Sequence, residues 1–164
     1  MINTENSKKD HSGSRGDILR DSAGDHVVAA KGGGPPISVT AHELQGVEMG
    51  LTLERTRGFK KVHFAIDSMV VYYILINKEE KPPWQLLQIW RRVNLLREFF
   101  DVLKISHVYR ETNRDANLLA SHHPPIKWMD VRTEDFSAEL HQIIKEDTDG
   151  TQYRRSYSFL SVLL

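Results

Sequence analysis

The sequence contains no cysteine among its 164 residues. Disulfide bonds and cysteine-ligated zinc sites are therefore excluded, and nothing in the composition favours an oxidising compartment. The fold must be held together by non-covalent packing alone. The chain is long enough to bury a sizeable core, and its length suits one domain with loose ends.

An excess of charge of either sign is also missing. Lys and Arg total 22, Asp and Glu total 22, and the formal net charge is +0 at pH 7. A global positive field of the kind that attracts nucleic acid is thus excluded. A local basic patch remains compatible with this balance.

Long hydrophobic runs are absent as well. No apolar stretch approaches the roughly 20 residues that a membrane-spanning helix needs, and the polar start "MINTENSKKD" lacks the apolar region of a secretory signal. We therefore expect a soluble, intracellular protein with no membrane partner. The sequence does not distinguish nucleus from cytoplasm.

The first half of the chain predicts a hairpin followed by a long helix. Residues 1–16 are rich in Ser, Lys, Asp and Gly, so we expect weak order there. Two β-prone runs surround the turn-forming "DSAGD" in residues 17–31, which indicates a hairpin. "GGGPP" then breaks the chain. Apolar residues at helical spacing over 38–59 predict a helix capped by Thr40 and ended at Gly58.

The second half alternates strands and helices. β-branched and aromatic residues predict two strands, and apolar periodicity predicts a short buried helix, a long amphipathic helix and a short helix capped by Asn113. The two strands are 60–66 and 102–109, and the three helices are 67–77, 84–100 and 113–121. This order predicts an α/β fold with a mixed sheet covered by helices, and it leaves room for another strand before the first helix. Residues 135–155 contain a further helical segment.

Two carboxylates occupy positions that suit a metal site. Glu43 falls in the first turn of the helix expected from Thr40, and Asp67 closes the strand 60–66. A few carboxylates on a rigid frame hold Mg²⁺, and a pair of such ions about 3.5–4 Å apart can activate water. Both residues also have structural interpretations, since Thr40 and Glu43 match a capping box and Asp67 matches a helix N-cap. On the residues alone, the structural interpretations are favoured.

Four segments change that balance when they are taken together. "GDILRDSAGDHVVA", "AHELQGVEMGL", "VHFAIDSMVV" and "ISHVYRETNRDANLLA" resemble, in order and spacing, the type 1 ribonuclease H-like domains abundant in plant genomes. The resemblance covers residues 2–121 and leaves 122–164 as a C-terminal extension. It implies a ribonuclease H-like fold, a five-stranded mixed sheet flanked by helices. It also implies cleavage of RNA in RNA·DNA hybrids with Mg²⁺ or Mn²⁺.

The resemblance implies a site of four carboxylate positions. Glu43 takes the second position and Asp67 the third, whereas "NTEN" places Glu5 at the first, where the family has an aspartate. These three residues are the implied metal ligands. "RETNRDANLLA" places Asn117 at the fourth, and an amide can ligate a hard cation but brings no negative charge. Asp115 is a poor substitute, because two residues along a helix a side chain lies on a different face.

The resemblance also implies contacts to nucleic acid from Arg110, Asn113 and Arg114. From the residues alone, solvated surface and phosphate contact are equally favoured for such arginines. His107, in the middle of the expected strand, is interpreted as structural. We expect three aromatic residues to lie in the core rather than to stack on bases, because they follow an amphipathic pattern: Trp84, Trp90 and Phe99.

Three functions remain open at this point. The first is a working ribonuclease H. The second is a nucleic-acid-binding domain whose cleavage of RNA is weak or lost. The third is a catalytically inactive protein-interaction domain or a retroelement-derived fragment. Because Glu5 and Asn117 alter two of the four positions, the second is favoured. Its expected partner is an RNA·DNA hybrid or RNA, and slow cleavage assisted by Mn²⁺ is compatible with it.

Overall fold

The first strand of the chain is shared by an antiparallel hairpin, which it forms with the second strand, and by a parallel pair, which it forms with the fourth. The computed structural model describes residues 2–9, 12–21, 26–34, 38–77, 81–109, 113–121 and 129–149. In this part of the chain one sheet has the order β5-β4-β1-β2-β3-β6. Its strands are β1 Ile2–Lys9, β2 Ser12–Arg20, β3 His26–Gly34, β4 Lys61–Ile66, β5 Val102–His107 and β6 Met129–Val131.

Strand β1 pairs with a neighbour on each side. It is antiparallel to β2 and parallel to β4, while β2 and β3 are antiparallel and β4 and β5 are parallel. The regular structure therefore begins at Ile2, not near Asp17 as composition predicted. Backbone hydrogen bonds to two neighbours outweigh the polar composition of residues 2–9. Composition alone does not show that a segment will lie in the middle of a sheet.

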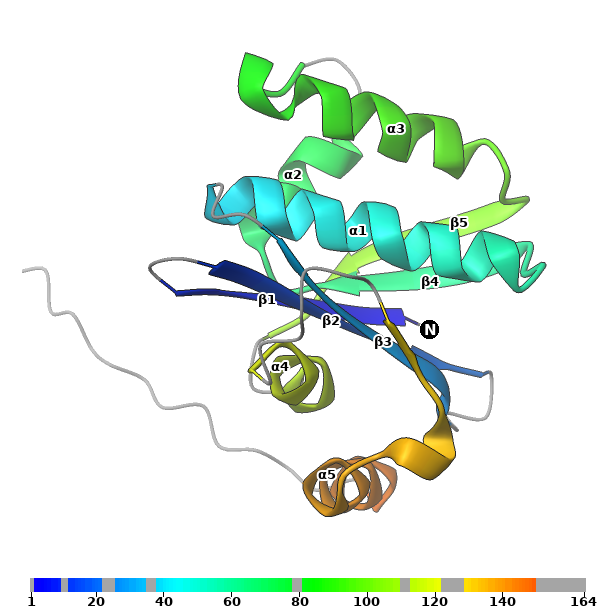
Figure 1. The fold of residues 1–164 in the computed structure, drawn as a ribbon. Coiled ribbons are helices and arrows are strands. Elements are labelled where there is room, and N and C mark those ends of the chain that lie inside the picture. The colour runs from blue at the N-terminus through cyan, green and yellow to red at the C-terminus, as the bar shows by residue number, and fades with distance from the viewer. Residues whose placement is uncertain are drawn as a thin grey trace, which may run out of the picture.

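Helices cover both faces of the sheet, as Figure 1 shows. One face carries α1 Val39–Thr56, α2 Met69–Ile76 and α3 Leu87–Arg97, which follows the 3-10 turn η1 Trp84–Leu86. The opposite face carries α4 Arg114–Ser121 and α5 Ala138–Thr148, which follows the 3-10 turn η3 Thr133–Asp135. The expected mixed sheet flanked by helices is confirmed. It has a sixth strand because β6, from the C-terminal extension, pairs with β3.

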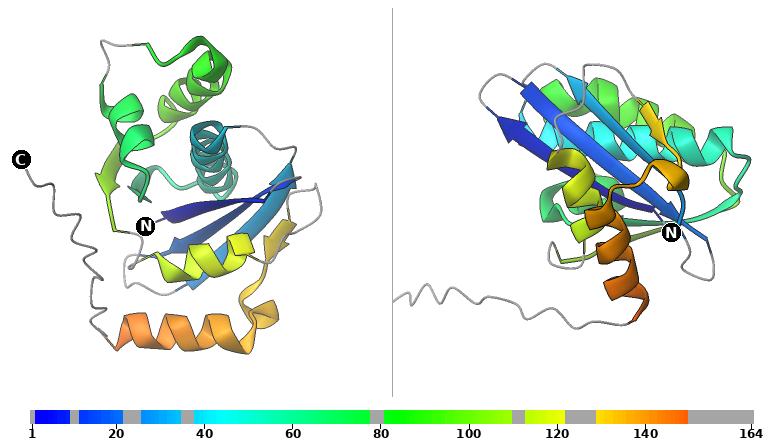
Figure 2. Two further views of the ribbon diagram at one scale, coloured as in Figure 1. Left: turned by 90° about the vertical axis from the view of Figure 1, so that its left-hand side faces the viewer. Right: turned by 60° about the horizontal axis from the view of Figure 1, so that its bottom comes forward.

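Each face of the sheet has its own hydrophobic core. Successive residues of β2 point to opposite faces, so Leu19 joins the core under α1 and Ile18 joins the core under α4. Figure 2 shows the two layers from two further directions, and in its left view α1 is seen end-on while α4 and α5 lie lengthwise below the sheet. Burial of each large apolar side chain contributes about 1.5–3 kcal/mol. Both helical layers are thereby fixed against the strands that carry the site.

The first helix begins two residues earlier than its sequence predicts. Ser38 is the N-cap, and its hydroxyl oxygen accepts a hydrogen bond from the N–H of Ala41 at 3.2 Å. Thr40 lies inside α1, so the predicted cap and the predicted capping box with Glu43 are wrong, and Glu43 falls in the second turn. Either hydroxyl residue suits an N-cap, and the sequence alone did not separate them. The predicted end is confirmed, because Gly58 has a φ of 79°.

The second helix also has a cap other than the one proposed. Ser68 caps α2, with its hydroxyl oxygen accepting from the N–H of Val71 at 3.4 Å, so the N-cap interpretation of Asp67 is wrong. Helix α2 is not buried as expected, since Val71 and Leu75 alone among its residues are buried. It rests on β4 and β5 with one side and leaves the other in solvent.

Two further expectations differ from the structure. Strand β3 ends at Gly34, within "GGGPP", which agrees with the predicted break, but no extra strand lies in the described residues between β3 and α1. Trp84 is 79% exposed, because it precedes the amphipathic stripe, which starts at Leu86. Trp90 and Phe99 pack against the core as predicted. No helix in the described ranges combines the length and the apolar composition that crossing a membrane requires.

Candidate active site

The pairing of two neighbouring parallel strands, β1 and β4, stops where β4 ends, although β1 itself continues to Lys9. The β1–β4 register pairs Thr4 with Ile66, so the backbone of Glu5 is one step beyond this pair, as Asp67 is. On its other side Glu5 pairs with Gly16 of β2. The side chain of Glu5 lies outside the described part of the structure. The backbone nonetheless places the first and third implied positions next to each other.

Asp67 is tied to β5 through its backbone. The ring Nε2 of His107 lies 3.1 Å from the carbonyl oxygen of Asp67, and the N–H of Val108 donates to the carbonyl of Ile66 at 2.8 Å. The carboxylate itself differs, because its Oδ1 is buried and has no hydrogen-bond partner among the described residues. A buried carboxylate oxygen without a partner is costly, and a bound cation would satisfy it.

Glu43 is brought to the sheet by the buried stripe of α1. Its neighbours Leu44 and Val47 belong to the core over the sheet, and Glu43 is itself buried. Since the capping box does not form, the local structural explanation for a glutamate at this position is removed. A buried carboxylate on the helix that covers β1 is a candidate ligand on the same face as that core.

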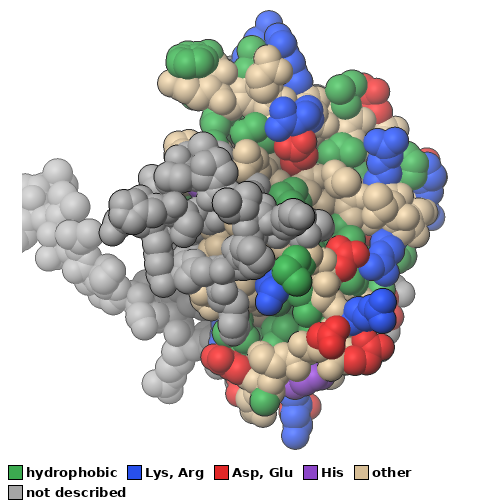
Figure 3. Space-filling view, in the orientation of Figure 1, with side chains coloured by type: hydrophobic (Ala, Val, Ile, Leu, Met, Phe, Trp, Pro, Cys, Tyr) green, Lys and Arg blue, Asp and Glu red, His purple; other side chains and the backbone are tan. Residues whose placement is uncertain are grey.

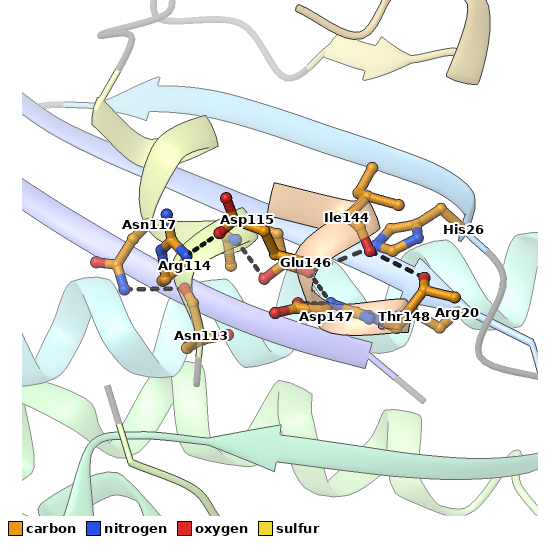
Figure 4. A network of polar contacts seen from close by, with 11 residues as sticks. Arg20, His26, Asn113, Arg114, Asp115, Asn117, Ile144, Glu146, Asp147 and Thr148 are labelled. Atoms are coloured by element: carbon orange, nitrogen blue, oxygen red, sulfur yellow. Dashed lines mark hydrogen bonds and ion pairs between the residues drawn. The ribbon is translucent and has the colours of Figure 1, made fainter. Parts of the chain in front are cut away.

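Asn117 uses its amide within the helix that carries it. In α4 its Nδ2 donates to the carbonyl oxygen of Asn113 at 2.9 Å, and its backbone N–H donates to the same oxygen at 3.0 Å (Figure 4). An ionised aspartate has no proton to donate, so it could not make the first of these bonds. The fourth position is therefore adapted to an amide in this chain.

Asp115 points away from Asn117 and anchors α4 instead. It is 0% exposed and forms an ion pair with Arg20 of β2, with the Nε2 of His26 3.5 Å away. Arg20 also binds Asp147 of α5 at 2.7 Å (Figure 4). Burial alone would raise the pKa of Asp115, but the His26 ring, the Arg20 charge and the N–H of Ala116 hold it below its ordinary value.

A close approach of backbones places α4 on β2. A Cβ added at Gly16 would lie 2.6 Å from the carbonyl oxygen of Ala116 and 2.6 Å from the Cβ of Leu119. Nearby, the hydroxyl of Ser14 donates to the carbonyl of Ala120. Only glycine fits at this contact, so Gly16 sets the distance between β2 and the helix that carries Asn117.

Two of the residues implied for nucleic-acid contact already interact within the protein. Asn113 is buried immediately before α4, and Arg114 in its first turn binds Glu146 of α5 at 2.6 Å. Arg110 lies outside the described residues. Figure 3 shows Lys and Arg side chains interspersed with Asp and Glu over one face of the molecule, in keeping with the neutral composition.

The donor set fits a cation with few charged ligands. Within the described ranges, no group of three or more His, Asp or Glu side chains converges into a metal cluster. The unpartnered Oδ1 of Asp67 is nevertheless the kind of atom that a hard cation satisfies. The residues present therefore fit one divalent cation at Asp67, with Glu43 and Glu5 as the other candidate carboxylates.

Sequence reasoning missed the ion pairs that hold the C-terminal extension. Arg20 and Asp147 are 127 residues apart in the chain, yet their side chains meet. No local pattern relates them, because the contact depends on how α5 folds back under the sheet. The only available signal was a helix-forming segment in residues 135–155, which α5 confirms.

This strand order, with carboxylate positions within β1, directly after β4 and on α1, defines a ribonuclease H-like domain. Residues 2–123 match the family described as reverse transcriptase-like, and the chain belongs to this family. The resemblance found in the sequence is thereby confirmed for the family. A comparison with curated proteins found no match.

Solved structures share the fold at low sequence identity. Ribonuclease H1 from Halobacterium salinarum has a TM-score of 0.70 at 21% identity, covering 74% of this chain and 94% of its own. The N-terminal ribonuclease H domain of a Mycobacterium tuberculosis protein has a TM-score of 0.68 at 18% identity, covering 74% and 90%. LC11 ribonuclease H1 in complex with an RNA/DNA hybrid has a TM-score of 0.66 at 16% identity, covering 74% and 93%.

Proposed function

We propose that this domain binds RNA·DNA hybrids across the strand ends at Asp67 and that its cleavage of the RNA strand is weak or lost. Membership of the family supports the binding, as does the likeness to a ribonuclease H1 that was solved with an RNA/DNA hybrid. The observation that carries the loss of cleavage is the Asn117 amide, which donates to its own helix.

The residues of this site have three different roles: metal binding, phosphate contact and, at position 117, a neutral amide in place of a base. Asp67 and Glu43, with Glu5, would hold Mg²⁺ or Mn²⁺, which when bound would supply activation of water and neutralisation of phosphate charge. Arg114 and Arg110 contact the phosphates, whereas Asn113, which is 0% exposed, holds Asn117 through its carbonyl oxygen. Asn117 adds a neutral oxygen and no proton acceptor, so general-base assistance, which contributes about 10²- to 10⁴-fold to a rate, is missing there.

Hybrid binding and cleavage are separable measurements. Fluorescence anisotropy with a labelled hybrid should show binding that weakens as salt rises, because phosphate contacts release counterions. An end-labelled hybrid should be cut slowly with Mn²⁺ and more slowly with Mg²⁺, and Asp67→Asn should remove the cutting. Rapid cleavage with Mg²⁺ by the native protein would overturn the proposed loss, and absence of hybrid binding would overturn the proposed function.

A matched variant controls for general charge effects in both measurements. Asp101→Asn removes one exposed carboxylate near the start of β5, at the far end of this strand from Asp67. It should leave both binding and cutting unchanged. A loss equal to that of Asp67→Asn would mean that the effect is electrostatic and not specific to the site.

A further inference from the structure

Four aromatic side chains form a connected series beside Asp67. The ring centroids of Tyr73 and Tyr72 are 5.8 Å apart, those of Tyr72 and His107 are 6.1 Å apart, and those of His107 and Tyr109 are 5.6 Å apart. We call these four residues the aromatic row. Tyr72 and Tyr73 come from α2, which follows β4, His107 ends β5, which flanks β4, and Tyr109 lies just after β5.

The two ends of the aromatic row are open to solvent. Tyr73 is 59% exposed and Tyr109 is 52% exposed, whereas Tyr72 and His107 between them are half-buried. Tyrosine usually buries its ring and keeps only the hydroxyl group wet. The two exposed rings each pack against a half-buried ring. They can therefore contact a ligand without a rearrangement of the backbone.

The aromatic row is continuous with the candidate site. His107, its third member, has its Nε2 3.1 Å from the carbonyl oxygen of Asp67. Tyr109 lies two residues after His107, and Tyr72 lies five residues after Asp67 in the adjoining helix. A nucleic-acid strand bound across the end of β4 at Asp67 would therefore have neighbouring nucleotides near these rings.

We propose that the aromatic row stacks unpaired bases of a nucleic-acid strand that extends beyond the site. The preferred ligand is then a hybrid with a single-stranded extension rather than a blunt one. Stacking on aromatic rings suits this role because every base has a π face, so binding tolerates any sequence. The location rests on the proposed function, whereas the stacking rests on the rings themselves.

The test compares three labelled ligands by anisotropy without added metal, so that none is cut. They are a blunt hybrid, the same hybrid with a single-stranded extension, and the extension alone. The native full-length chain should bind the extended hybrid roughly tenfold more tightly than the blunt one, within the range that one stacked base contributes. Tyr73→Ala and Tyr109→Ala should each reduce that preference several-fold, and Tyr73→Phe and Tyr109→Phe should keep it.

Leu95→Ala is the matched control, because it removes an exposed apolar side chain from α3 outside the aromatic row. It should leave the preference unchanged. Equal binding of blunt and extended hybrids by the native chain would overturn the proposed stacking on the aromatic row and leave the proposed function standing. Binding of the extension that depends on the tyrosines, with no binding of the blunt hybrid, would overturn the proposed function and leave the proposed stacking on the aromatic row standing.

A second measurement covers the case in which an alanine variant does not fold. Photocrosslinking of the native chain to an extension that carries 4-thiouridine, followed by mass spectrometry of the peptides, locates the contact directly. Crosslinks to the peptides containing Tyr73 or Tyr109 are expected. Crosslinks that map only elsewhere on the chain would overturn the proposal.

Discussion

Among single residues, Asp67 is a candidate metal ligand with an unsatisfied oxygen. Its Oδ1 is buried without a hydrogen-bond partner among the described residues, while its backbone carbonyl is close to His107. A group kept in an unfavourable environment is expected where function requires it, since activity often conflicts with stability. Asp67 should therefore oppose folding in the absence of metal and favour it when a cation binds.

Asp67→Asn should raise the free energy of unfolding by about 1 kcal/mol in metal-free buffer, because it removes the negative charge from a group whose Oδ1 is buried without a hydrogen-bond partner among the described residues. Mg²⁺ should raise the Tm of the native protein, since it binds only the folded state, and should not raise the Tm of the variant. Thermal unfolding followed by circular dichroism, with and without the ion, measures both effects. Equal responses of the two proteins to Mg²⁺ would contradict a cation site at Asp67.

Glu54 in α1 is a second residue whose environment controls stability. It is 2% exposed, and burial raises the pKa of its carboxyl to about 7, with a smaller opposing effect from the positive N-terminus. Between the ordinary value of 4.5 and about 7 the folded state therefore holds a proton that the unfolded state has lost. Linkage then requires stability to fall as pH rises through this range.

Glu54→Gln should remove this fall. Unfolding by urea at pH 5 and at pH 8 should show the native protein losing about 1–3 kcal/mol more than the variant between the two values. A shared pH dependence would mean that other groups control it. Glu98→Gln, which alters an exposed carboxylate after α3, should behave like the native protein.

At the scale of elements, α4 and α5 are held to the sheet by charge and by close contact. Arg20 of β2 bridges Asp115 of α4 and Asp147 of α5, and Arg114 of α4 binds Glu146 of α5 (Figure 4). Since Asn117 lies on α4, these contacts position the fourth site residue. The extension after the family match is thus structurally coupled to the domain.

Asp115→Asn should destabilise the protein by about 1–3 kcal/mol, because the largely buried Arg20 then loses one of its two carboxylate partners and keeps only Asp147. Its folded pKa is lowered, so the stability that Asp115 contributes is present above its ordinary value of 3.8 and is lost as pH falls through the folded value. Denaturant unfolding of both proteins at neutral and acidic pH tests this. The difference should shrink in acid, and a constant difference would contradict the role of charge.

Gly16→Ala should destabilise the protein by about 1–3 kcal/mol, because the new Cβ would meet the backbone of α4 and force a shift. Gly58 is the contrasting position, since a Cβ there has nothing within 4 Å but the φ of 79° strains any other residue. Chemical-shift changes in Gly16→Ala should spread to Asn117 and its neighbours. An unchanged stability would mean that α4 is not seated as described.

At the scale of the whole molecule, the sequence predicts the order of strands and helices well and their partners poorly. Apolar spacing identified α1 and α3, and the motifs identified Glu43 and Asp67 as candidates. The central place of β1 was not predictable, since residues 2–9 look polar and their pairing is non-local. For the same reason β6 and the Arg20–Asp147 ion pair were missed.

The candidate site divides in the same way. The identity of residue 117 is local information, and the motif around it was enough to indicate a missing carboxylate. That its amide donates to Asn113 is visible only in three dimensions. A carboxylate restored at position 117 would restore cleavage only if the other site residues are already in place. Their placement depends on contacts between distant parts of the chain.

Cleavage of an end-labelled RNA·DNA hybrid by the native chain and by Asn117→Asp, in Mg²⁺ and in Mn²⁺, tests this account most directly. The account predicts little cleavage by the native protein and at least a hundredfold increase in the variant, from the carboxylate that it restores. The double variant Asn117→Asp, Asp67→Asn should cut nothing. Equal, rapid cleavage by the native chain and Asn117→Asp would contradict the account.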